Sequence, residues 1–176
     1  MDTTKTKIKN RKYKTLMPNT NSSTIKVQKR DGRLEDLDIN KIHFVVEEAC
    51  EGLSGVSSSQ IEMNANIQFY DGMTTKDIQN VLVRSANDLI SLETPNYQYA
   101  AARLLSYDVR KEAHGQYEYI PLLKLIIRNV RSGVYDKAIL DKYTKTEIKK
   151  FNTWIKRERD LRFTYAGLRQ ICDKYL

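Results

Sequence analysis

The chain has 176 residues, with 30 Lys and Arg, 22 Asp and Glu, and a formal net charge of +8. The length fits one domain or two small ones, and a hydrophobic fraction of 40% can support a packed core. Residues 1–30 hold nine basic side chains and one acidic one, whereas residues 31–176 hold 21 of each sign. The sequence therefore excludes a uniformly basic nucleic-acid-binding domain and predicts a neutral body behind a basic leader.

Other classes of protein are excluded by what the sequence lacks. No apolar run approaches the ~20 residues of a membrane span, and the leader has no apolar core of the kind found in secretory signals. Two cysteines, Cys50 and Cys172, cannot build a disulfide scaffold, and both lie in apolar helical patterns typical of a reducing compartment. We therefore expect a cytoplasmic protein that binds neither membranes nor nucleic acid and holds no structural metal.

The first ordered element is predicted to be a β-hairpin. Residues 1–23 mix Lys, Thr, Asn and Ser and are expected to form a disordered basic leader. From Thr24 the pattern changes, because residues 25–29 alternate apolar and polar side chains and Asp31-Gly32 is a strong turn signal. Residues 34–37 can pair back, which predicts a hairpin over residues 25–38. Since two strands alone are marginal in water, the hairpin must lie on helices.

Four amphipathic helices are predicted next, each with a capping residue at its start and most with a glycine at its end. They are expected from Asp38 or Asn40 to Gly52, from the Ser57–Ser59 run to Tyr70, from Thr74 or Thr75 to about Leu89, and from Thr94-Pro95 to Gly115. A polar and aromatic connector over residues 115–119 follows them.

Three further helices are predicted beyond the connector. Apolar residues over 122–130 form a stripe that ends at Gly133, and Thr144 with Glu147 forms a capping box before the next helix. The stripe over residues 165–175 continues to the end of the sequence, so we expect it to pack on something that follows. The predicted fold is mainly α, in three parts: residues 1–23, 24–115 and 116–176.

No catalytic constellation is visible, since the chain has no glycine-rich phosphate loop, no nucleophile motif and no Cys-x-x-Cys pair. The notable feature is a cluster of cations around the predicted hairpin, formed by Lys29, Arg30, Arg33 and Lys41. Cations beside a helix N-terminus suit a triphosphate. Taken alone, however, these residues favour a solvated, charged hairpin over a nucleotide site.

A resemblance to a known family changes this balance. Residues 27–32 (Val-Gln-Lys-Arg-Asp-Gly) followed by residues 38–42 (Asp-Ile-Asn-Lys-Ile) resemble the opening of the ATP-cone domain. Short motifs at residues 67–72, 74–78, 88–91, 95–104, 110–116, 133–136, 159–160 and 165–166 look like the large subunit of aerobic class I ribonucleotide reductase. The resemblance covers residues 24–176. It implies a β-hairpin capping a four-helix ATP-cone, followed by a short helical segment, and a domain that binds ATP or dATP to regulate ribonucleotide reduction.

The resemblance also implies ten nucleotide-binding residues. Phosphates would meet Lys29, Arg30 and Lys111, with Lys41 near the phosphates or the sugar. The remaining six would lie near the base or the sugar or in the third helix: Glu35 and Asp38 by the adenine, Val27 and Ile42 lining the base pocket, Thr75 capping the helix beside the sugar, and Gln79 one turn into that helix.

Two of these positions depart from the family's usual pattern. The family often has Asn where Asp38 stands, and His where Gln79 stands, and that His helps the inhibitory response to dATP. The resemblance therefore predicts that this chain binds ATP but responds more weakly to dATP.

The family's catalytic barrel and its cysteines are not present in this sequence, so the chain alone is not expected to reduce a ribonucleotide. It is expected to be either a fragment or the product of a split gene. Its partners would be the remainder of the reductase large subunit and the small subunit, in a bacterial or phage-infected cell, and Mg²⁺ would accompany the triphosphate. The absence of cysteine from the leader argues against a transcriptional repressor with a zinc ribbon before its ATP cone. The alternative is a helical protein-interaction module with a degenerate, non-binding ATP cone.

Overall fold

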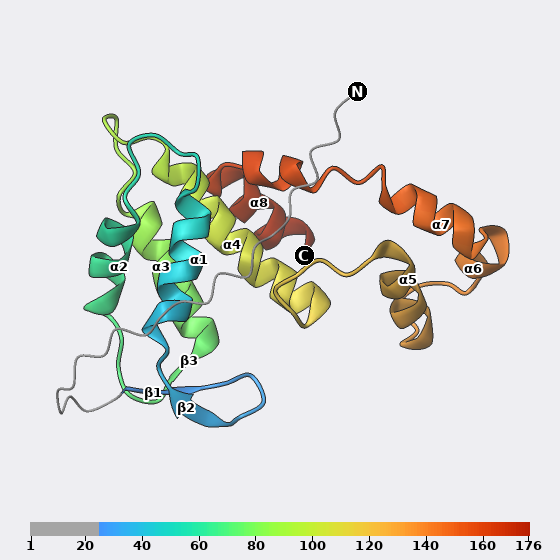
Figure 1. The fold of residues 1–176 in the computed structure, drawn as a ribbon, viewed down its shortest axis with the longest axis horizontal. Helices are drawn as coiled ribbons and strands as arrows, with labels where there is room; N and C mark the ends of the chain where they lie inside the picture. The colour runs from blue at the N-terminus through green and yellow to red at the C-terminus, as the bar shows by residue number, and fades with distance from the viewer. Residues whose placement is uncertain (1–24) are drawn as a thin grey trace, which may run out of the picture.

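The computed structural model describes residues 25–176, so the predicted leader over residues 1–23 lies outside the described residues. Figure 1 shows a small sheet beneath a helical bundle, with further helices extending to one side. The fold is mainly α, as predicted. Its elements are β1 (Lys26–Gln28), β2 (Leu34–Asp36), α1 (Ile39–Cys50), α2 (Ser58–Asn66), β3 (Met73–Thr74), α3 (Thr75–Asn87), α4 (Tyr97–His114), α5 (Leu122–Arg131), α6 (Ala138–Lys142), α7 (Lys145–Asn152), the 3₁₀ helix η1 (Arg157–Arg162) and α8 (Tyr165–Tyr175).

The predicted hairpin is present, and the structure adds a third strand to it. Strands β1 and β2 pair antiparallel, with Val27 opposite Glu35, and Gly32 has the positive φ of +85° that the turn requires. Strand β3, which was not predicted, pairs parallel to β1 with Met73 opposite Val27. Val27 and Met73 are 2% and 4% exposed, so the sheet is anchored on the helices through these two side chains.

The bundle helices start at side-chain caps, as the sequence indicates. The carboxylate of Asp38 caps α1, the hydroxyl of Ser57 caps α2 and the hydroxyl of Thr74 caps α3. Three boundaries differ from the prediction. Helix α2 ends at Asn66, before the residues that lead into β3. Thr75 is the first residue of α3 and not its cap, and α4 begins at Tyr97, after the turn that contains Pro95.

Helix α4 lies at the centre of the buried core and contacts α1, α3 and α8. Its small residues Ala100 and Ala101 are fully buried, as is Leu104, so neighbouring helices can approach closely. Leu168 of α8 belongs to the same core. The first part of the last apolar stripe therefore packs back on α4. At the end of the stripe Tyr175 and Leu176 are 79% and 81% exposed, and the expectation that it packs on something that follows stays a prediction.

Residues 116–176 contain more elements than predicted. Helices α5 and α7 pack together, with Ile126 and Ile148 buried, and lie apart from the bundle in Figure 1. The capping box of Thr144 and Glu147 is confirmed, with both of its hydrogen bonds present. The short helix α6 and the 3₁₀ helix η1 were not predicted.

The connector after α4 is held by aromatic and cationic side chains. The guanidinium of Arg110 lies 5.1 Å from the ring centre of Tyr117 and 4.3 Å from that of Tyr119. Tyr117 donates its hydroxyl to Glu48 of α1 at 2.5 Å, and Arg157 of η1 lies 4.2 Å from the ring of Tyr119. These contacts fix the chain leaving α4 against both α1 and η1.

Two features are absent from residues 25–176. No helix there is long and apolar enough to cross a membrane. Within the same residues, no group of three or more His, Cys, Asp or Glu side chains could hold a metal ion.

The position of Leu104 predicts a large loss of stability on truncation. Leu104→Ala should reduce the free energy of unfolding by about 2–5 kcal/mol, because it leaves a cavity in a fully buried site. Urea denaturation measures this difference. Leu92, which is 96% exposed, supplies the control: Leu92→Ala should change stability by less than about 0.5 kcal/mol. Equal effects of the two substitutions would contradict the central place of α4.

His43 predicts a pH dependence of stability. Its ring nitrogens lie 2.8 Å from a Glu62 oxygen on α2 and 3.1 Å from a Glu47 oxygen, and these contacts raise the His43 pKa above its usual 6.5. A raised pKa means that this contribution to stability is complete below the unfolded-state pKa and disappears as pH rises through the folded-state pKa. The Tm deficit of His43→Gln should therefore be larger at about pH 5.5 than at about pH 8.5. A deficit that grows with pH would contradict this assignment.

Candidate functional site

Most of the predicted site residues line one cavity. This cavity, of about 130 Å³, lies where the sheet meets α1, α3 and the end of α4. Eight of the ten predicted residues line it: Val27, Lys29, Asp38, Lys41, Ile42, Thr75, Gln79 and Lys111. Arg30 lines a wider hollow of about 480 Å³ that shares Lys29 and Thr75 with the cavity. Glu35 is not among the residues that line either space.

One end of the cavity is apolar. The predicted residues Val27 and Ile42 lie there with four residues that the prediction did not include, Leu37, Val45, Ile78 and Leu82. Leu37 lies between β2 and α1, whereas the other three are on α1 and α3. The helical spacing predicts these three as buried positions but gives no sign that they line a cavity. An apolar wall of branched side chains can accept a flat, apolar surface of a ligand.

The other end of the cavity is cationic. Lys29 follows β1, Arg30 stands in the hairpin turn, and Lys111 comes from the last turn of α4. Burial, together with the neighbouring charges of Arg30 and Lys29, lowers the pKa of Lys111. Within the described part of the chain, no carboxylate lies within 4.0 Å of the Lys111 ammonium group, and its nearest ring is that of Tyr117 at 5.9 Å. Two neighbouring cations of the hairpin and one cation of α4, distant in the sequence, thus lie close together.

The start of α3 provides a further polar feature. Thr74 caps the helix by accepting a hydrogen bond from the backbone N–H of Asp77 at 3.0 Å. Thr75, as the first helical residue, lines both the cavity and the wider hollow. The first N–H groups of a helix have no partner within the helix and carry its positive dipole end. A phosphate group in the hollow would therefore face Lys29, Arg30 and a helix N-terminus.

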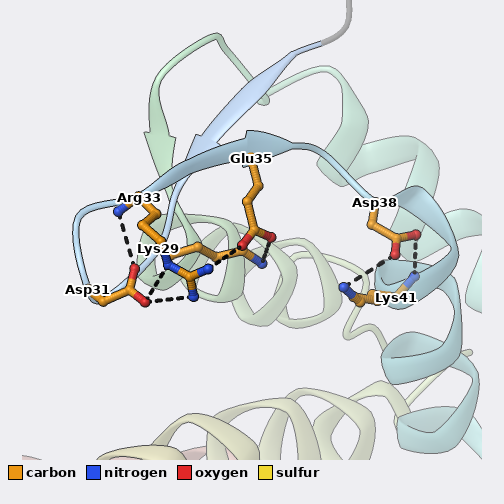
Figure 2. A network of polar contacts seen from close by, with 6 residues as sticks. All are labelled: Lys29, Asp31, Arg33, Glu35, Asp38 and Lys41. Atoms are coloured by element: carbon orange, nitrogen blue, oxygen red, sulfur yellow. Dashed lines mark hydrogen bonds and ion pairs between the residues drawn. The ribbon is translucent and has the colours of Figure 1, made fainter.

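Figure 2 shows how ion pairs hold the polar side chains of the hairpin and of α1. The carboxylate of Glu35 lies 3.2 Å from the Lys29 ammonium and 3.5 Å from the Arg33 guanidinium, and Arg33 also pairs with Asp31 at 2.7 Å. Glu35 thus pairs with two cations of the hairpin. A second and separate pair lies at the start of α1.

That second pair consists of Asp38 and Lys41. One oxygen of Asp38 accepts the backbone N–H groups of Asn40 and Lys41 at 3.1 and 3.3 Å, and its other oxygen lies 3.4 Å from the Lys41 ammonium. Asp38 therefore serves first as the cap of α1. It still lines the cavity, beside Lys41.

Gln79 is buried, with 6% of its surface exposed. Its side-chain amide donates to the carbonyl oxygen of Leu104 on α4 at 2.8 Å. This bond joins α3 to α4. It also fixes the orientation of the amide of Gln79, which lines the cavity.

The structure adds three charged residues that the prediction missed. Lys76 lines the wider hollow and lies 2.5 Å from a carboxylate oxygen of Glu112. Asp108 of α4 lies 2.9 Å from the Arg30 guanidinium. Asp108 and Glu112 could be found by their four-residue spacing on one helix face, but no sequence signal joins them to Arg30 or Lys76.

A small sheet packed on a helical bundle, with a cavity between them that apolar and cationic side chains line, defines a mainly helical domain with a candidate binding site. Comparison with known proteins identifies it further. Residues 25–112, half of the chain, match the ATP cone domain family. The chain therefore belongs to the ATP-cone domain family.

Similarity to curated proteins extends beyond the cone. The chain is 45% identical over 150 residues to ribonucleoside-diphosphate reductase 1 subunit alpha of Escherichia coli K12, covering 85% of this chain and 20% of the relative. It is 42% identical over 155 residues to ribonucleoside-diphosphate reductase subunit alpha of Haemophilus influenzae, covering 88% of this chain and 20% of the relative. It is 42% identical over 154 residues to the same subunit of Enterobacteria phage T4, covering 86% of this chain and 20% of the relative. The chain thus spans about a fifth of the length of these relatives.

Proposed function

We propose that this chain is the allosteric region of a ribonucleoside-diphosphate reductase large subunit, and that it binds ATP and dATP at the cavity between the sheet and α3. Residues 24–115 would form the ATP cone and residues 116–176 the helical segment that follows it. One observation carries the proposal: a single cavity has an apolar end beside Val27 and a cationic end at Lys29 and Lys111. The similarity to reductase alpha subunits supports it.

The two ends of the cavity match the two ends of the nucleotide. The adenine would lie against Val27 and Ile42, and its exocyclic amine could donate to the Asp38 carboxylate, which only accepts. The phosphates would extend toward Lys29, Lys111 and the first turn of α3. Mg²⁺ would accompany the triphosphate chiefly through phosphate oxygens and water, as is usual for this ion.

The nucleotide would not react in this site. It would shift the cone between arrangements that favour active or inhibited assemblies of the reductase, with a coupling free energy of about 1–3 kcal/mol. The partners required for this are the remainder of the large subunit, in the same or a separate chain, and the small subunit, in the cytoplasm of a bacterial or phage-infected cell.

Calorimetric titration of the 176-residue chain with ATP tests the proposal. The wild-type chain should bind ATP, and Lys111→Gln should weaken binding by about tenfold to a hundredfold, since a hydrogen bond to a charged group contributes about 1.5–3 kcal/mol. Lys174→Gln, on the exposed end of α8, removes the same charge far from the cavity and should leave affinity unchanged. No binding of ATP by the wild-type chain would favour the alternative, a helical protein-interaction module with a non-binding cone.

We also propose that Gln79 weakens the response to dATP. Its amide is committed to the Leu104 carbonyl, whereas an imidazole at this position would offer a ring nitrogen to the cavity. Activity of the assembled reductase should fall little as dATP is added, and Gln79→His should make inhibition stronger at the same dATP concentration. Strong inhibition of the wild-type enzyme at low dATP would contradict this assignment.

A further inference from the structure

Two ion pairs join α4 to the cationic end of the site. The Asp108 carboxylate lies 2.9 Å from the guanidinium of Arg30 in the hairpin turn. The Glu112 carboxylate lies 2.5 Å from the ammonium group of Lys76 in the first turn of α3. Asp108 and Glu112 are four residues apart on one helix and therefore share a face. They approach, from one side, two of the cations that line the wider hollow.

The two carboxylates differ in exposure. Asp108 is 7% exposed, and burial, together with the charge of Glu112, raises its pKa even though Arg30, Lys76 and Lys111 act in the opposite direction. The Glu112 side chain is about half exposed, and its hydrogen bond with Lys76 lowers its pKa. A carboxylate in a buried position is costly unless it has a partner. For Asp108 that partner is Arg30, which also lines the hollow where the proposed function places the phosphates.

We propose that Asp108 and Glu112 are internal counter-anions of the nucleotide site. They hold Arg30 and Lys76 when the site is empty, and they reduce the gain in affinity that each additional phosphate gives a bound nucleotide. This inference rests on the proposed function, because it specifies how the same site responds to the charge of its ligand.

The physical reason is competition for the same two cations. Phosphate oxygens that reach Arg30 or Lys76 must displace a carboxylate or share the cation with it. In both cases the phosphate meets the negative charge of Asp108 or Glu112 at short range. Solvent screens the buried Asp108 weakly and the half-exposed Glu112 more strongly. A triphosphate carries more charge than a diphosphate, so the repulsion is greater for ATP than for ADP and is absent for adenosine.

The two substitutions Asp108→Asn and Glu112→Gln remove each charge and keep the shape of the side chain. The amide oxygen of each variant can still accept from Arg30 or Lys76, so these cations keep a hydrogen-bond partner. Titration of the full chain should show ATP binding about threefold to tenfold more tightly to each variant. The change should be smaller for ADP and absent for adenosine, so the ratio of ATP to ADP affinity should rise.

Two controls make the result decisive. Asp141→Asn, on the exposed helix α6, changes the net charge equally and should leave the ATP to ADP ratio unchanged. If Asp108→Asn does not fold, as judged by circular dichroism, the half-exposed Glu112 supplies the deciding variant. An unchanged or lower ATP to ADP ratio in a folded variant, with a wild-type chain that binds ATP, would overturn the counter-anion role and leave the proposed function standing. A wild-type chain that binds no ATP would overturn both.

Discussion

The burial of α4 is the constraint on which the rest of the structure depends. Ala100, Ala101 and Leu104 are fully buried, and α1, α3 and α8 all pack against this helix. A helix fixed on three sides has little freedom to rotate, so its last turns present a fixed set of side chains to the sheet. Those turns carry Asp108 and Lys111. The packing that stabilises the bundle therefore also positions the charges of the site.

The sequence predicts much of this fold because many of its signals are local. The caps at Asp38, Ser57 and Thr74 and the turn at Gly32 depend on residues within a few positions, and all are present in the structure. Strand β3 was missed for the opposite reason. It has two residues, too few for a visible alternation, and it exists because Met73 reaches Val27 across 46 positions of sequence. Pairing at that distance is decided by the packed core, which no local pattern describes.

The residues of the site likewise differ in whether local sequence or distant contacts determine them. The apolar residues that α1 and α3 contribute to the cavity follow from helical periodicity, and the sequence shows the cations near the hairpin as a cluster. Residue patterns alone, however, could not distinguish a binding site from a solvated surface. The resemblance to a family supplied Lys111 and Gln79, which are distant in sequence from the hairpin, and eight of its ten residues line the cavity. The assignments to base, sugar and phosphate remain predictions. The acidic partners of the cations were missed because Asp108 meets Arg30 only after 78 positions of chain have folded.

Four cations of the site are paired with carboxylates of the described chain, and this pairing has two opposing effects. Lys29, Arg30, Lys41 and Lys76 each have a carboxylate within 3.4 Å, which holds four long side chains in order before a ligand arrives and so lowers the entropic cost of binding. The same carboxylates compete with the ligand. For the exposed pair of Asp38 and Lys41 both effects are small, because solvent screens them. For Asp108, which is buried, neither effect is small.

Lys111 is half-buried and has no carboxylate within 4.0 Å in the described chain. It is therefore the cation that gains most from a phosphate, because no internal partner has to be displaced.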